Sequence, residues 1–269
     1  MPSKHPQLLA FLIVLLQVLT TNAQEKPFAW PEGKAVAISL TFDDGRYSQV
    51  EGGTALLDEF KTKATFYVVP SAVEQRLEGW KKAVANGHEI GNHSLNHPCS
   101  GNFPWARTKA LENYSIKQMQ DELKEASKQI QQLLGVTPKE FAYPCGQKFV
   151  GRGKDTKSYV PVVAELFNSG RGWLDEGAND PQFCDFAQLT GMESDGKDFE
   201  EVLALINQAK TNHHWLVLAG HEMATDGAQT TRLSMLRKLL AYANDPANGI
   251  WIAPVGTVGK YIDEQRKQH

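Results

Sequence analysis

The sequence lacks an excess of charge of either sign. Its 269 residues carry 28 Lys and Arg against 31 Asp and Glu, which gives a formal net charge of −3. Domains that bind nucleic acid concentrate basic residues to offset phosphate charge, so we expect no nucleic acid partner. The chain is long enough for one substantial hydrophobic core or two small ones. Internal repeats, low-complexity segments and Pro- or Gly-rich linkers are also lacking, and we therefore predict one domain.

Cysteine is scarce, because the chain contains only Cys99, Cys145 and Cys184. These three residues lack the CxxC spacing of a zinc knuckle, which argues against such a structural zinc site. In an exported protein, an odd number of cysteines allows one internal disulfide here and leaves one thiol free.

One long hydrophobic run is present, and it lies near the N-terminus. Lys4 and His5 precede the apolar residues 8–16, and residues 21–23 are small enough for a signal peptidase to recognise. We predict a signal peptide over residues 1–23, an extension over 24–34, and a secreted or periplasmic protein without stable membrane insertion after cleavage. A membrane anchor is the alternative, although the run is shorter than the roughly 20 apolar residues of a full span.

Short apolar segments alternate with helical patterns along the rest of the chain. The expected strands are residues 35–42, 64–69, 88–92, 140–143, 215–219 and 250–253. The expected helices are residues 54–60, 74–85, 115–134, 159–167, 199–209 and 232–243. This alternation predicts parallel βαβ units. The pattern leaves open whether the strands close into a barrel or form an open doubly wound sheet.

Polar or turn-forming residues follow the carboxyl ends of four expected strands. Asp43 and Asp44 follow the first strand, His93 the third, Pro144 the fourth, and His221 the late apolar strand. Catalytic and ligand-binding groups gather at this end of parallel strands. We therefore expect these residues, which are distant in the sequence, to meet at one site.

Two of these segments suit a metal ion. His93 and His97 in HSLNH are four residues apart, so a helical turn would place both on one face. Two His and one Asp suit zinc and its first-row neighbours and leave coordination positions open for water and substrate. Each segment has a simpler explanation alone, since HxxxH arises by chance and TFDDG suits a turn with Gly45 at positive φ. A cation would, however, offset the repulsion between adjacent carboxylates.

Together these segments resemble the polysaccharide deacetylases of carbohydrate esterase family 4, which have the nodulation-factor deacetylase (NodB) homology domain. TFDDG at 41–45 is similar to the first family motif, HSLNH at 93–97 to the second, FAYPCG at 141–146 to a variant of the third, and LAGH at 218–221 to the fifth. The resemblance covers residues 35–265. It implies a single-domain α/β fold, a distorted (β/α) barrel of about seven parallel strands.

The resemblance also implies the chemistry of the site. It makes Asp43 the catalytic base and His221 the general acid, and it places the backbone N–H of Cys145 as the oxyanion donor. The implied ligands of a divalent metal, most often Zn with Co, Ni or Mn as alternatives, are Asp44, His93 and His97.

Two positions depart from the family motifs. Ala142 stands where the third motif usually has an Arg that orients the base, and we expect Arg171 to replace that Arg from another strand end. The fourth motif usually supplies an Asp for the acid His, followed by a Trp. Trp173 fits that Trp, and Asp175 or Glu176 is our candidate for the Asp.

Cys145 stands where the family commonly has an aromatic residue, and Cys99 follows the second motif by two residues. Both thiols are therefore expected near the site. A Cys99–Cys145 disulfide and a free Cys145 remain open alternatives.

Long connections over residues 98–114 and 172–190 are expected beside the site, and long loops of this kind are often functional. We expect substrate contacts from Trp105 and Trp173 in these loops and from Tyr143 and Pro144 after the fourth strand. The alternative for the aromatic residues of the first loop is that they pack beneath it.

The predicted protein is an exported, monomeric, metal-dependent hydrolase that removes acetyl groups from an N-acetylated polysaccharide or oligosaccharide. The same site could instead cleave O-acetyl esters of a xylan-like glycan. A third alternative is an inactive glycan-binding protein, against which the complete set of a base, three metal ligands and an acid argues.

Overall fold

The computed structural model describes residues 27–268. The predicted signal peptide lies outside the described residues. Within them, no helix combines the length and the apolar character needed to cross a bilayer.

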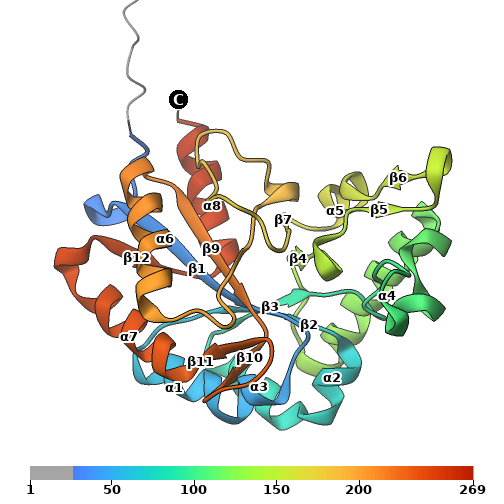
Figure 1. Cartoon of the computed structure of the whole chain (residues 1–269), viewed down its shortest axis with the longest axis horizontal. Helices are drawn as coiled ribbons and strands as arrows, with labels where there is room; N and C mark the ends of the chain where they lie inside the picture. The colour runs from blue at the N-terminus through green and yellow to red at the C-terminus, as the bar shows by residue number, and fades with distance from the viewer. Residues whose placement is uncertain (1–26, 269) are drawn as a thin grey trace, which may run out of the picture.

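A parallel sheet that curls into a distorted half-barrel forms the centre of the fold (Figure 1). Its strands run in the order β7–β4–β3–β2–β1–β9–β8, and β12 pairs with the first residues of β1. The strands are β1 Val36–Phe42, β2 Thr65–Val68, β3 Glu89–Asn92, β4 Glu140–Ala142, β7 Ser169–Arg171, β8 Met192–Glu193, β9 Trp215–Gly220 and β12 Ile250–Ile252. The predicted distorted barrel of about seven parallel strands in one α/β domain is confirmed.

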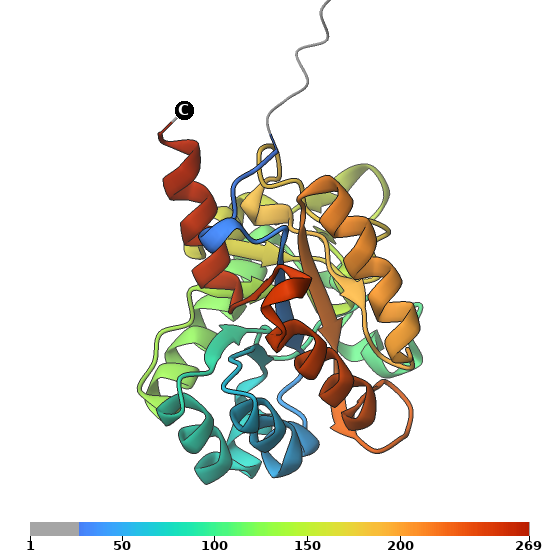
Figure 2. The same cartoon turned by 90° about the vertical axis from the view of Figure 1, so that its left-hand side faces the viewer.

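Helices cover the outside of this sheet (Figures 1 and 2). They are α1 Thr54–Glu59, α2 Pro70–Gln75, α3 Leu77–Ala85, α4 Ile116–Leu134, α5 Val160–Leu166, α6 Phe199–Asn212, α7 Leu233–Asn244 and α8 Val255–Arg266. Two small ribbons lie apart from the sheet, formed by β5 Phe149–Val150 with β6 Lys157–Ser158 and by β10 Glu222–Ala224 with β11 Thr230–Arg232. Neither β8 nor α8 was among the predicted elements.

The predicted boundaries of α4, the longest helix, are correct to within one residue because the sequence carries a clear signal at each end of the helix. The Ser115 side chain accepts a hydrogen bond from the backbone of Gln118, and the Gln118 side chain accepts one from the backbone of Ser115. This capping box satisfies amides that the first helical turn leaves free. The helix ends at Gly135, which takes a left-handed φ of 72°.

The two faces of the central strand β1 differ in polarity, and the polar face leads to the site. Val36, Ile38, Leu40 and Phe42 belong to the main hydrophobic cluster. On the other face, the Ser39 and Thr41 hydroxyls donate to backbone carbonyls of neighbouring segments. Side chains alternate along a strand, so Asp43 continues this polar face.

Candidate functional site

A cavity of about 710 Å³ contains most of the predicted site residues. The predicted residues among its lining are Asp43, Asp44, His93, His97, Trp105, Cys145, Trp173 and His221. These residues come from segments that follow β1, β3, β4, β7 and β9. A larger cavity of about 850 Å³ is lined by other residues, including Glu89 and Glu140.

Asp43 and Asp44 share the cavity because the backbone turns between them. The amide of Asp43 still donates to the carbonyl of Gly220, as in the ladder between β1 and β9. Asp44 and Gly45 then take positive φ angles of 72° and 74°. The turn expected at Gly45 is present, and it redirects two carboxylates that a straight strand would place on opposite faces.

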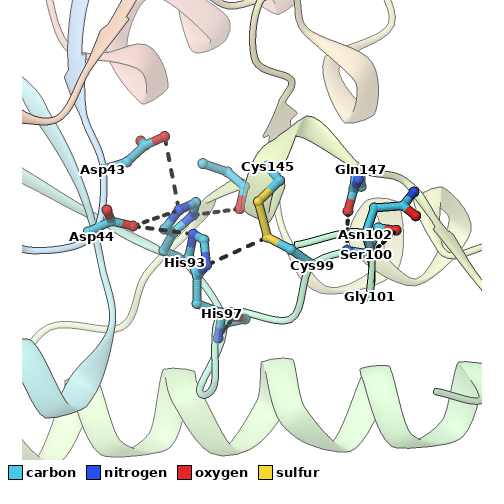
Figure 3. Close-up of a disulfide and its surroundings, with 12 residues drawn as sticks. Asp43, Asp44, His93, His97, Cys99, Ser100, Gly101, Asn102, Cys145 and Gln147 are labelled. Carbon is cyan, nitrogen blue, oxygen red and sulfur yellow. Dashed lines mark hydrogen bonds and ion pairs between the residues drawn. A yellow bond between two sulfur atoms is a disulfide. The ribbon is translucent and has the colours of Figure 1, made fainter. Parts of the chain in front are cut away.

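Asp44, His93 and His97 form a compact group of metal donors. The Asp44 Oδ1 atom lies 3.4 Å from His93 Nε2 and 3.3 Å from His97 Nε2, and the three donor atoms lie within 4.8 Å of one another (Figure 3). His93 Nδ1 lies 2.9 Å from the carbonyl oxygen of Ala142, which can only accept a hydrogen bond. Nδ1 therefore carries a proton, and Nε2 faces the donor group. The residues thus fit a divalent cation.

The two histidines do not lie on a helical turn, although their spacing would suit one. They belong to an irregular loop in which Ser94 and His97 have positive φ angles of 64° and 50°. Asn92 Oδ1 accepts from the Ser94 amide, and Ser94 Oγ accepts from the His97 amide. These bonds bring the rings to a centroid separation of 4.8 Å without a helix.

The electrostatics favour the protonation states that a metal ion needs. Burial by itself raises the pKa of Asp44, but the hydrogen bond and charge of His93 and the charges of His97 and His221 lower it well below its usual range. Burial, helped by the charge of His93, lowers the pKa of His97 to about 4. At neutral pH Asp44 is therefore ionised and His97 is neutral, as metal ligands must be.

Arg46 was not identified from the sequence. Its guanidinium contacts Asp44 Oδ2 at 2.8–2.9 Å, on the carboxylate oxygen that does not face the histidines. The sequence feature that could have identified Arg46 is its position two residues after the Asp pair. The contact fixes the orientation of the Asp44 carboxylate.

Arg171 donates a hydrogen bond to the carboxylate of Asp43, and both side chains are buried. Ala142 of β4 is paired in register with Arg171 of β7. The guanidinium therefore enters the site from the strand beside the position where the family usually has Arg. A second nitrogen of Arg171 donates to the Gly172 carbonyl at 2.6 Å, which fixes the guanidinium plane.

The partner of His221 is Asp195. His221 Nδ1 lies 2.7 Å from Asp195 Oδ2, and Asp195 Oδ1 accepts from the His221 amide at 3.1 Å. Burial by itself lowers the pKa of His221, but the Asp195 hydrogen bond and nearby carboxylates raise it overall. The candidates Asp175 and Glu176 are wrong, because Asp175 accepts from the Gly191 amide and Glu176 is exposed.

Asp195 was missed because β8, which precedes it, has only two residues. The Ser-Asp-Gly turn that follows was the available signal. Gln49 was also missed: its buried amide donates to the carbonyls of Asp43 and His221 at 2.7 and 2.8 Å. It therefore ties together the segments of the predicted base and acid.

Cys99 and Cys145 form a disulfide beside the donor group (Figure 3). The alternative of a free Cys145 is therefore excluded. The remaining thiol, Cys184, lies beside Arg266 instead.

The substrate contacts predicted for the side chains of Tyr143 and Pro144 need correction. The Tyr143 side chain is 1% exposed and packs against Phe141 and Tyr159, and its hydroxyl donates to the Ala187 carbonyl. Pro144 is buried, and neither residue lines the cavity. Tyr143 is oriented this way because its hydroxyl finds a backbone acceptor in the core.

Aromatic side chains form one wall of the cavity. Trp105 is 61% exposed and stacks on Phe103 with ring centroids 5.6 Å apart. Trp173 packs edge-on against His221 with a centroid separation of 4.7 Å. Trp105 thus does not pack beneath its loop. Tyr114 does, because its hydroxyl donates to Glu122 and its ring packs on a buried cluster.

Residues 30–159 match the sequence profile of the family described as polysaccharide deacetylase. The chain is 31% identical over 133 residues to a peptidoglycan-N-acetylglucosamine deacetylase of Bacillus cereus. This alignment covers 45% of this chain and 44% of that protein. The first curated relatives it matches are aligned over only 10–25% of their own length.

Solved structures share the fold. A putative polysaccharide deacetylase from Mycobacterium smegmatis superposes with a TM-score of 0.66 at 17% identity, over 89% of this chain and 94% of that one. A family 4 acetyl xylan esterase from Clostridium thermocellum, in complex with a cobalt ion, gives a TM-score of 0.55 at 20% identity, over 84% and 91%.

Proposed function

Residues 30–159 of the chain match the polysaccharide deacetylase family, and from this premise we propose that the protein is an exported, monomeric, metal-dependent hydrolase that removes acetyl groups from an N-acetylated glycan. One observation carries the proposal. The Asp43–Arg171 pair and the His221–Asp195 pair both reach the cavity that holds the donor group Asp44, His93 and His97. Export is supported by the hydrophobic N-terminal run over residues 8–16.

Asp44, His93 and His97 would hold the divalent cation. When bound, such an ion polarises an acyl carbonyl and lowers the pKa of water. The ion could be zinc or a neighbouring first-row metal such as Co, Ni or Mn.

Asp43 accepts the proton of the attacking water in this proposal, and Arg171 holds its carboxylate in place. Cys145 lines the same cavity, and in this proposal its backbone N–H stabilises the oxyanion of the tetrahedral intermediate. His221, oriented by Asp195, then protonates the departing amine so that the C–N bond can break. Trp105 and Trp173 contact the sugar rings at the cavity wall.

Acetate release from a panel of acetylated glycans tests the proposal. Chitin oligomers, peptidoglycan and acetylated xylan are compared before chelation, after chelation, and after reloading with zinc or cobalt. We expect release from an N-acetylated substrate, loss with chelator and recovery with metal. Preference for xylan would instead support the O-acetyl esterase, and no release from any reloaded sample would support a glycan-binding protein.

The adjacent carboxylates provide a matched pair of variants for the assigned roles. Asp43→Asn should retain cobalt and lose turnover by about 10²–10⁴-fold, the usual contribution of a general base. Asp44→Asn should lose cobalt affinity. Loss of cobalt by Asp43→Asn with retention by Asp44→Asn would mean that the two roles are reversed.

A further inference from the structure

The disulfide joins two segments that the proposed function uses for different tasks. Cys99 lies two residues after His97, a proposed metal ligand, and Cys145 bears the proposed oxyanion donor. The segments are 46 residues apart in the sequence and belong to the connections after β3 and β4. Figure 3 shows the disulfide bridging them directly beside the Asp44, His93 and His97 group.

The disulfide contacts the side of His97 that faces away from the donor group. His97 Nε2 points to Asp44, while His97 Nδ1 lies 3.7 Å from Cys99 Sγ. A neutral histidine that ligates through Nε2 carries its proton on Nδ1, and that proton is normally donated to an oxygen. His93 has such an acceptor in the Ala142 carbonyl. Among the described residues His97 Nδ1 has no oxygen acceptor, and Cys99 Sγ takes that place.

At its other end the disulfide is attached to a residue whose backbone conformation is disfavoured for residues other than glycine. Cys145 has φ 54° and ψ 17°, in the left-handed region that a non-glycine residue rarely adopts. The direction of the Cys145 N–H depends on this local conformation. The Ser100 amide also donates to Gln147 Oε1, so a hydrogen bond ties the same two segments close to the disulfide.

We infer that the Cys99–Cys145 disulfide is a positioning element that orients His97 for metal binding and the Cys145 N–H for oxyanion stabilisation, and that loss of the covalent bridge weakens both. The inference about turnover rests on the proposed deacetylation, whereas the inference about metal affinity rests only on the proposed metal ligands Asp44, His93 and His97.

An external dithiol supplies the electrons for reduction of the disulfide. One thiolate of the reagent attacks Cys145 Sγ, because Cys145 is partly exposed while Cys99 is fully buried. The S–S bond breaks as a mixed disulfide forms, and the second thiol of the reagent displaces Cys145. Two electrons and two protons pass to the protein, which then carries two thiols, and the reagent leaves as a cyclic disulfide.

The inference is tested by measuring the cobalt affinity of four proteins. The visible absorption of bound Co²⁺ reports the fraction of protein that has bound the metal. The four proteins are the wild type, Cys99→Ala/Cys145→Ala, Cys99→Ser/Cys145→Ala, and the control Cys184→Ala, which keeps the disulfide. We expect the double alanine variant to bind cobalt about 10–100-fold more weakly, as when a ligand loses its outer partner. Cys99→Ser/Cys145→Ala should recover part of that loss by offering His97 an oxygen, and Cys184→Ala should match the wild type.

Kinetics separate positioning from simple stabilisation. At saturating cobalt, the double alanine variant should show a lower kcat with little change in KM. A lower melting temperature together with wild-type Kd and kcat would overturn the inference, as would equal Kd values for the alanine and serine variants. Should the variants not fold, wild-type protein that has been reduced with a dithiol, alkylated with iodoacetamide so that the freed thiols cannot bind cobalt, and freed of reagent must show the same weakening.

The two proposals can fail separately. Absence of acetate release from every substrate contradicts the proposed function but leaves the cobalt comparison valid. An unchanged cobalt Kd in the double alanine variant contradicts the positioning role even if the wild type deacetylates a glycan.

Discussion

Arg171 and Asp43 lie 128 positions apart in the sequence, and the guanidinium of Arg171 donates to the Asp43 carboxylate in the interior of the barrel. Arg171 is 0% exposed and Asp43 3%. Burying both charges costs solvation energy that only close pairing offsets. Each side chain therefore depends on the other, and the pair holds the carboxylate at the edge of the cavity.

Replacement of Arg171 by methionine tests this dependence. Arg171→Met leaves the Asp43 carboxylate buried without its partner, so we expect the free energy of unfolding to fall by about 3–5 kcal/mol in urea titrations. Arg237→Met is the control, because it removes an exposed pair with Glu59 and should leave stability essentially unchanged. If Arg171 orients the base, Arg171→Met also loses acetate release while it retains cobalt. Wild-type turnover in this variant would contradict that role.

The hydrogen bond between Asp195 and His221 predicts a change in pH dependence. Asp195 helps to raise the pKa of His221, so the protonated acid persists to higher pH in the wild type. Asp195→Asn removes the negative partner, and the alkaline limb of the kcat/KM profile should move to lower pH. Asp175→Asn is the matched control, since Asp175 bonds to the Gly191 amide and not to His221. An alkaline limb that stays in place for Asp195→Asn would rule out the assignment.

We expect replacement of Trp105 to weaken substrate binding with little effect on folding. Its ring is largely exposed at the cavity wall, so Trp105→Ala should leave the melting temperature unchanged. Loss of stacking on a sugar should raise KM for glycan oligomers roughly tenfold, equivalent to about 1.4 kcal/mol. Phe149→Ala removes an exposed aromatic that does not line this cavity and serves as the control. Equal KM values for both variants would exclude a sugar contact by Trp105.

The raised pKa of Glu140 leads us to expect that the stability of the protein falls as the pH rises. Burial, followed by the charge of Glu89, raises the pKa of Glu140 to about 8, although hydrogen bonds from Ser169 and Asn168 oppose the shift. The unfolded chain has the ordinary value of 4.5, so the folded state binds more protons between these two pH values. This carboxyl group therefore lowers the free energy of unfolding as pH rises from about 4.5 to 8, by at most about 1.4 kcal/mol per pH unit.

Urea titrations between pH 5 and pH 9 measure that slope. Glu140→Gln should show a flatter dependence on pH than the wild type, because the amide does not titrate. Glu74→Gln, at an exposed position of α2, should keep the wild-type slope. An identical slope in Glu140→Gln would mean that other groups cause the pH dependence.

Much of the fold could be predicted from the sequence because its signals are local. Apolar runs such as residues 35–42 indicated β1, and the capping box and Gly135 bounded α4 within one residue. The elements that were missed lack such signals or depend on distant partners. β8 has two residues, too few to show a period. Helix α8 contributes Val255, Val258 and Ile262 to a buried cluster that also contains Trp30 and Ala37 of β1, so its position depends on distant residues.

The sequence by itself determined which chemical groups follow the strand ends, because motif spacing and residue type are local properties. Asp43, Asp44, His93, His97 and His221 were identified in this way. Only the tertiary structure decided what those groups contact. Strand register placed Arg171 beside Ala142, β8 brought Asp195 to His221, and the approach of two loops paired Cys99 with Cys145. Each of these contacts joins residues more than 20 positions apart, and such contacts follow from packing and strand order, which no local pattern encodes.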